Sequence, residues 1–216
     1  MDSFKAMLYT FARLGLLFLL DLFGMFCGAV LFPCIATLIP ASSGDGATKK
    51  GQLTVSGLKA FFTDPIVGSV IGFVIMTAIL VFIFYDDGKK HAAYEEWSWE
   101  NILVVLVILL LAAFVPAIFR ESFKESATMT VFYNGLYYPL SWLCDGVGTG
   151  LTRTYRDEVS GGFGLPYTVA VLVGNGIQLG LCFAAYVFSF MLYVKRHPVI
   201  LKAKALDNED EAEDDE

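Results

Sequence analysis

The sequence predicts an all-α integral membrane protein: a bundle of four or five transmembrane helices with an aromatic interfacial or re-entrant segment and a disordered acidic C-terminal tail. Hydrophobic residues make up 56% of the chain and charged residues only 17%, which leaves too few polar groups to cover a soluble domain of this size. Four stretches also approach or exceed the roughly 20 apolar residues that cross a hydrocarbon core about 30 Å thick. Residues 1–204 are therefore predicted to form one transmembrane helical domain.

Negative charge is concentrated at the C-terminus. The formal net charge is −7, yet the last ten residues, DNEDEAEDDE, carry eight carboxylates, so the rest of the chain is close to neutral. A run of like charges buries no apolar surface and stays solvated. Residues 205–216 are therefore predicted to be a disordered, solubilising tail, with docking of a basic partner as the alternative.

The stretches with little or no charge define the predicted spans. They are residues 14–39, 65–85, 102–119 and 167–194. The first is interrupted by the charge of Asp21 and by Pro33. The second has a clear start, because Asp64 can cap free backbone N–H groups and Pro65 suits the first helical position.

A polar stretch, DDGKKHAAYEEWSWE, separates the second and third spans and predicts a tight hairpin over residues 86–100. Trp97 and Trp99 stand where this hairpin would enter the third span. Tryptophan rings favour the headgroup level of a bilayer, so both are predicted to be interfacial anchors.

Residues 127–144 decide the number of crossings. The stretch carries no charge and is just long enough to cross, but Pro139 would disturb a helix there. Its aromatic side chains favour the interface, and the predicted anchors among them are Tyr133, Tyr137, Tyr138 and Trp142. On a helix these four form two rows of residues four positions apart. An interfacial or re-entrant segment and a fifth crossing both stay open.

Two further patterns bear on that choice. Lys and Arg are nearly balanced between the two sides of a four-crossing chain, and only five crossings leave an excess, on the side of the C-terminal tail.

Asp21 and Asn175 also lie at similar distances from the starts of the first and last predicted spans. They would share a depth if those spans ran in the same direction, as five crossings require. The orientation stays open as well.

Small residues at intervals of four recur on three of the spans. They are Gly24 and Gly28, then Gly68 and Gly72, and finally Gly176, Gly180 and Ala184. Such spacing lets helix backbones approach closely in a membrane. The first, second and last spans are therefore predicted to pack together. The third span, rich in Leu, Val and Ile, is predicted to face lipid or a partner.

Asp21 is the ionisable side chain that lies well inside a predicted span. A carboxylate in hydrocarbon costs about 3 kcal/mol or more unless it is paired, protonated or hydrated. Asp21 shares a helix face with Gly24 and Gly28, so it points at protein. With Asn175 and Gln178 it forms either part of a cation or proton path or an ordinary polar contact between helices.

The sequence predicts no enzyme, no cofactor and no metal site. The cysteines lie in apolar stretches without CxxC spacing, at Cys27, Cys34, Cys144 and Cys182. His91 and His197 fall in predicted loops. Zinc ligation, paired haem ligation and a Ser-His or Cys-His pair within the spans are therefore not expected.

Two functions fit these features. The first is a non-catalytic, structural or accessory subunit of a larger membrane complex, which binds other membrane subunits or copies of itself. The alternative is a small transporter or channel component with Asp21 on a cation or proton path. In both cases the protein is expected to be multi-pass, with the lipid bilayer as its solvent and no nucleic acid as partner, in a membrane that the sequence does not specify.

Overall fold

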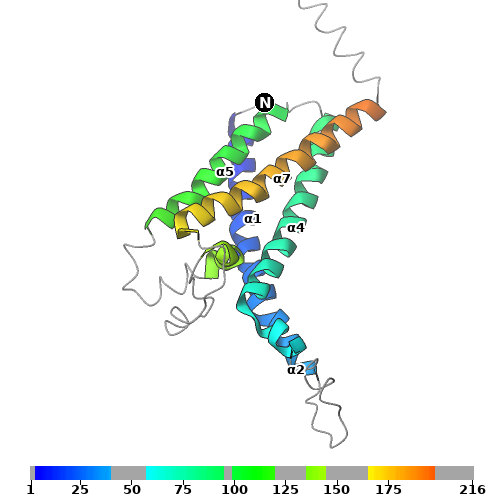
Figure 1. The fold of residues 1–216 in the computed structure, drawn as a ribbon. Coiled ribbons are helices and arrows are strands. Elements are labelled where there is room, and N and C mark those ends of the chain that lie inside the picture. Colours follow the sequence, from blue (N-terminus) through cyan, green and yellow to red (C-terminus); the bar gives the residue numbers. More distant parts are fainter. Residues whose placement is uncertain (1–2, 40–56, 95–98, 120–134, 145–164, 198–216) are drawn as a thin grey trace, which may run out of the picture.

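The computed structural model describes residues 3–39, 57–94, 99–119, 135–144 and 165–197 (Figure 1). Within these ranges nearly every residue is helical. The predicted acidic tail, 205–216, lies outside the described residues, as do Trp97 and Tyr133.

Long helices make up the described fold. The first comprises α1 (Ser3–Met25), η1 (Phe26–Leu31) and α2 (Phe32–Leu38), which follow one another without a break. It is followed by α4 (Pro65–Tyr94), α5 (Trp99–Phe119) and α7 (Tyr167–Arg196). Among the described residues, these four helices are long and apolar enough to cross a membrane. They alternate in direction, so α1 begins and α7 ends at the same end of the bundle (Figure 1).

The helices form a closed bundle in which α1 and α7 each pack against both α4 and α5. The core between them is aliphatic, sulfur-containing and aromatic. Its most buried members include Leu17, Met76, Leu109, Cys182 and Tyr186. The outer faces of all four helices carry large exposed hydrophobic side chains, such as Leu19, Phe82, Val104 and Phe188.

The first helix begins at Ser3, well before residue 14, where the predicted first span begins. Polar residues before that position find partners without ending the helix. The Thr10 hydroxyl donates to the Ala6 carbonyl at 2.8 Å, and Arg13 pairs with a carboxylate of α4. The helix can therefore start before the apolar stretch, because its polar side chains have hydrogen-bond or ion-pair partners.

Pro33 does not break this helix, because a wider turn precedes it. η1 is a π-helix, and the N–H of Phe32 donates to the carbonyl of Cys27 five residues earlier. In an α-helix, a proline lacks the N–H and its ring collides with the carbonyl four residues back. The extra residue in a π turn relieves that collision.

Asp64 caps α4 as the sequence predicts, since its carboxylate accepts the N–H of Ile66 at 2.8 Å. The other end of α4 differs from the prediction. The helix continues to Tyr94, so the expected hairpin starting at residue 86 is wrong over the described residues. Asp86 and Lys90 pair at 2.6 Å on the exposed side of the helix. The side chain of the neighbouring Asp87 turns into the bundle, where it forms an ion pair with Arg13.

Residues 135–144 form a buried turn and the short 3-10 helix η3 (Tyr138–Leu143). The segment lies between the end of α5 and the start of α7, which meet at the same end of the bundle (Figure 1). It packs against α1, α4 and α7. A fifth crossing helix over residues 127–144 is therefore wrong for this part of the chain, and 127–134 lies outside the described residues.

Backbone carbonyls of the neighbouring helices explain why the tyrosines of this segment turn inward. The Tyr137 hydroxyl donates to the Ala113 carbonyl at 2.7 Å, and the Tyr138 hydroxyl donates to the Pro65 carbonyl at 3.3 Å. Burial and the Asp64 carboxylate raise the pKa of Tyr138 to about 12, so its phenol stays a donor. Both side chains are only 3% exposed.

The interfacial role predicted for Tyr137 and Tyr138 is therefore wrong. Trp142 is half-buried, with its ring edge-on to Phe73 at 5.6 Å. Trp99 is the first residue of α5.

Two glycine pairs bring the first helix and α4 into backbone contact. A Cβ atom placed on Gly28 would collide with the Gly68 carbonyl, and one placed on Gly72 would collide with the Gly24 carbonyl. The pairing is antiparallel, with Gly24 opposite Gly72 and Gly28 opposite Gly68. η3 covers this crossing, because the Cβ position of Gly24 also lies 3.0 Å from Pro139 Cγ.

The third row of small residues lies elsewhere. Cβ atoms on Gly176 and Gly180 would meet nothing within 4 Å, and Ala184 is exposed. The expectation that this row packs against the first two spans is therefore wrong. α7 instead turns its polar side chains Asn175 and Gln178 inward and its glycines outward, next to α5.

Gly68→Ala is expected to lower the free energy of unfolding by about 2 kcal/mol, because overpacking at a close contact forces the backbones apart. The new Cβ would lie 2.5 Å from the Gly28 carbonyl oxygen. Gly180→Ala is the matched control and is expected to change little. Thermal unfolding of both purified variants measures the difference. Equal melting temperatures would contradict the backbone contact.

Candidate functional site

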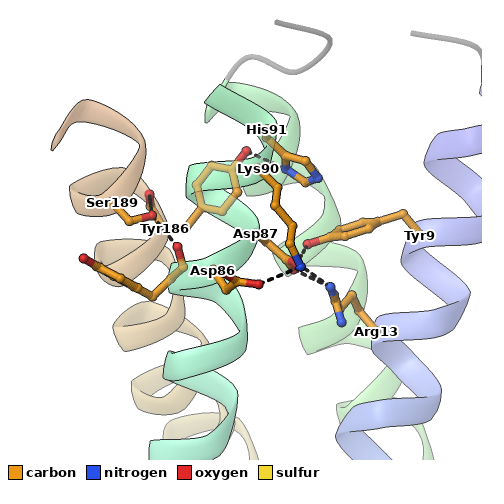
Figure 2. A network of polar contacts seen from close by, with 9 residues as sticks. Tyr9, Arg13, Asp86, Asp87, Lys90, His91, Tyr186 and Ser189 are labelled. Atoms are coloured by element: carbon orange, nitrogen blue, oxygen red, sulfur yellow. Dashed lines mark hydrogen bonds and ion pairs between the residues drawn. The ribbon is translucent and has the colours of Figure 1, made fainter. Parts of the chain in front are cut away.

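Most of the buried polar side chains of the described residues belong to two sets, which also include partly buried neighbours. The first set, termed the Asp21 layer, consists of Asp21, Thr77, Ser141, Asn175 and Gln178. The second, termed the helix-end network, consists of Tyr9, Arg13, Asp87, His91, Tyr186 and Ser189 (Figure 2).

The glycine crossing positions the α1 side of the Asp21 layer. Asp21 lies one turn before Gly24 and on the same face of the helix. The Cβ position of Gly24 is 3.0 Å from Pro139 and 3.3 Å from Met76. Asp21 therefore faces the space between α4 and η3, where Thr77 follows Met76 and Ser141 follows Pro139 by two residues.

The other side of the layer comes from α7. A Cβ atom on Gly174 would collide with Leu140 of η3, which places Asn175 beside the same turn of η3. Gln178, one helical turn further on, donates from Nε2 to the Thr77 hydroxyl at 3.3 Å. Both amides share a face of α7. The Asp21 layer thus draws residues from α1, α4, η3 and α7.

This arrangement corrects the depth argument made from the sequence. Four crossings were expected to leave Asp21 and Asn175 at opposite depths. That expectation is wrong because the first helix begins at Ser3, which puts Asp21 near the middle of the continuous helix from Ser3 to Leu38. The glycine pairs set Asp21 near the level of Thr77 on α4, and Gln178, one turn after Asn175, bonds Thr77 from α7.

Oxygen atoms of the Asp21 layer lack hydrogen-bond partners. Within the described residues, no donor reaches Asp21 Oδ1, Ser141 Oγ, Asn175 Oδ1 or Gln178 Oε1. The four side chains are 3%, 5%, 2% and 0% exposed, respectively. A buried acceptor without a donor costs about 1–3 kcal/mol, and more when it is charged. The layer therefore combines one carboxyl group with hydroxyl and amide groups, several of whose oxygen atoms have no partner among the described residues.

The helix-end network pairs its charges by contrast, although no acceptor of the described residues reaches Arg13 Nε. The Arg13 guanidinium bonds both carboxylate oxygens of Asp87, at 2.6 Å and 2.5 Å. The Tyr9 hydroxyl donates to the same carboxylate at 2.7 Å, and the Arg13 guanidinium lies 4.8 Å from the centre of the Tyr9 ring. These contacts join the first helix to α4, as Figure 2 shows.

The same network continues from α4 to α7. His91 Nδ1 and the Tyr186 hydroxyl are 2.9 Å apart, and the Ser189 hydroxyl donates to the Tyr85 carbonyl at 2.5 Å. Gly88 allows this approach, because a Cβ there would collide with Ser189. His91 is helical, so its predicted loop position is wrong. His197 directly follows the last residue of α7.

Sequence reasoning missed the helix-end network. It placed Arg13 before the first span and Asp87 in a hairpin, whereas both lie on helices that pack together. The sequence did contain a signal. Arg13 precedes the first predicted span and Asp87 follows the second, so in two neighbouring antiparallel spans they lie at the same end. The network connects three helices.

The described residues contain no group of three or more His, Cys, Asp or Glu side chains that could hold a metal ion. Cys27, Cys34, Cys144 and Cys182 are free thiols. Comparison of the chain with protein-family models, with curated proteins and with solved structures finds no match. The two polar sets and the outer surface are therefore the basis for any functional assignment.

Asp87→Asn is expected to lower the free energy of unfolding by about 3 kcal/mol, because it leaves the largely buried Arg13 guanidinium without its carboxylate. The matched control is Asp86→Asn, on the exposed side of the same turn, which is expected to change little. Chemical unfolding of the purified variants provides the measurement.

A paired variant separates the lost ion pair from a local packing defect. Arg13→Met with Asp87→Leu is expected to recover most of the loss, because neither charge is then left buried and unpaired. If the double variant is less stable than Asp87→Asn alone, the ion-pair explanation is wrong.

Proposed function

We propose that the chain is an integral, multi-pass membrane protein that acts as a non-catalytic structural subunit, bound to another membrane protein or to a second copy of itself. The proposed membrane location is supported by the four apolar helices and by the large hydrophobic side chains on their outer faces. In water, surfaces of this kind would aggregate. In a bilayer they are solvated by acyl chains.

The observation that carries the subunit role is an apolar groove between α5 and α7. It is lined by Leu103, Leu106, Val107 and Leu110 of α5 and by Gly176, Leu179, Gly180 and Phe183 of α7. All of its lining residues are apolar or glycine. The α7 side of the groove includes Gly176 and Gly180, where an added Cβ would meet no atom of the described residues within 4 Å.

The chain already contains one contact between helices that is built on small residues at intervals of four. Where Gly24 and Gly28 meet Gly72 and Gly68, glycines let two backbones approach within contact distance. Helix association in lipid depends on this close packing, since apolar side chains are as well solvated by lipid as by protein. A second row of the same spacing, facing outward beside a groove, suits a partner helix in the same way.

The test is site-specific photo-crosslinking in native membranes. A photoreactive amino acid at Val107, in the groove, is expected to give an adduct of discrete mass, whereas one at Phe82, which is 71% exposed on α4, is expected to give none. Gly180→Leu fills the groove and should abolish the adduct. The matched control Gly15→Leu, at another open glycine, should preserve it.

An adduct of twice 23.7 kDa identifies self-association, and another discrete mass identifies a different subunit. Adducts of equal strength from Val107 and Phe82, or none from either, would contradict the proposed role.

Membrane topology gives a second test. Because α1 begins and α7 ends at the same end of the bundle, cysteines at Lys5 and Lys195 are expected to react with an impermeant maleimide from the same side. A cysteine at Leu58, which is 48% exposed before the start of α4, is expected to react from the other side. A cysteine-free background removes labelling of Cys34. Labelling of Lys5→Cys and Lys195→Cys from opposite sides would require an odd number of crossings.

A further inference from the structure

The outer face of α7 carries large and small residues side by side. Gly176 is followed by Ile177 and Gly180 by Leu181, and Val173 lies one turn before them. The side chains of Val173, Ile177 and Leu181 are 38%, 46% and 49% exposed, respectively. Cβ atoms on the two glycines would meet no described atom within 4 Å. Because positions four apart share a helix face, the branched residues form a ridge along α7 and the glycines form a low row beside it.

This arrangement suits contact with an identical face. Two copies of one chain that share an orientation in a bilayer pair about a twofold axis along the membrane normal, and such an interface joins the same patch on both copies. A patch that pairs with itself must therefore carry its protruding and its low residues at the same depth. The outer face of α7 meets this condition, because Ile177 lies at the level of Gly176 and Gly180. Each copy would place its Ile177 over the glycines of the other.

The groove between α5 and α7 has room for such a side chain. Its volume is about 170 Å³, which is comparable to the roughly 150 Å³ of a cavity that holds a benzene molecule. Val107 of α5 and Phe183 of α7 are among its lining residues. A branched side chain that enters from a second copy would therefore exchange loose lipid contacts for close protein contacts, and close packing is what drives helix association in lipid.

The charge and the extent of the face also fit a second copy. Every exposed residue from Leu103 to Phe119 of α5 and from Leu172 to Met191 of α7 is apolar or glycine, so identical faces meet without the repulsion that like charges would cause. These two stretches carry fourteen large apolar side chains that are 38% to 63% exposed. The face is thus large enough to supply the roughly 800 Å² per partner that an ordinary interface buries.

We propose that the chain forms a twofold-symmetric dimer in which α7 of each copy lies in the groove between α5 and α7 of the other. Ile177 is the protruding residue of this contact, and Gly176 and Gly180 of the second copy receive it. The inference rests on the proposed function, because the groove is the same, and it identifies the partner as a second copy of the chain.

The test uses the purified full chain in liposomes, with no other protein present. Half of the sample carries a donor fluorophore and half an acceptor fluorophore at Lys195→Cys, in the cysteine-free background. Energy transfer between the copies is expected to fall reversibly as lipid is added, and the midpoint gives the dissociation constant. Single labelled particles are expected to bleach in no more than two steps.

Variants assign the dimer contact to this face. Gly180→Leu fills the groove and is expected to abolish energy transfer. Ile177→Ala removes the protruding side chain from both copies and is expected to weaken dimerisation by about tenfold. The matched controls lie on other outer faces: Gly15→Leu, at an open glycine of α1, and Phe82→Ala, at a side chain that is 71% exposed on α4. Both controls are expected to dimerise like the unmodified chain.

Three results would overturn the proposal: a chain that stays monomeric at every lipid ratio, more than two bleaching steps, or a dimer whose affinity is unchanged in Gly180→Leu and Ile177→Ala. If Gly180→Leu does not fold, the comparison of Ile177→Ala with Phe82→Ala decides, since equal affinities in both would also reject the contact. A monomer in liposomes together with a Val107 adduct of another mass in native membranes would reject the dimer and leave the subunit role intact.

Discussion

The contact of two glycine pairs is the constraint on which the rest of this structure depends. With Gly24 against Gly72 and Gly28 against Gly68, the register between the first helix and α4 is determined to within a residue. The same crossing forms the surface on which η3 rests. It also fixes the level of Asp21, one turn away on the same face. A single backbone contact thus sets the topology of the buried segment and the place of the buried carboxylate.

The two buried aspartates show what a structural carboxylate looks like in this chain. Asp87 has an arginine and a tyrosine hydroxyl within hydrogen-bond distance, and its burial is thereby compensated. Asp21 is as deeply buried, but no donor of the described residues reaches its Oδ1 atom. Burying a charged carboxylate without a partner is costly, so the two aspartates contribute differently to the stability of the bundle.

Local sequence was sufficient for the presence of the helices and for the contact between the glycine pairs of the first helix and α4, but not for the row of small residues on α7. The cap at Asp64 and the faces carrying Gly24 and Gly72 could be predicted because they depend on neighbours a few positions away. The extents of the helices could not, because Arg13 and Asp87 look like span ends until their pairing across 74 residues is known. Tyr137 and Tyr138 likewise resemble interfacial anchors, and only the distant carbonyls that receive their hydroxyls draw them inward.

Helix α7 turns two kinds of residue to opposite sides. Asn175 and Gln178 are buried in the bundle, while Gly176 and Gly180, interleaved with them in the sequence, line the outer groove. A partner helix seated on these glycines would therefore press on the backbone that carries the buried amides, and the bond from Gln178 to Thr77 would pass that contact on to α4.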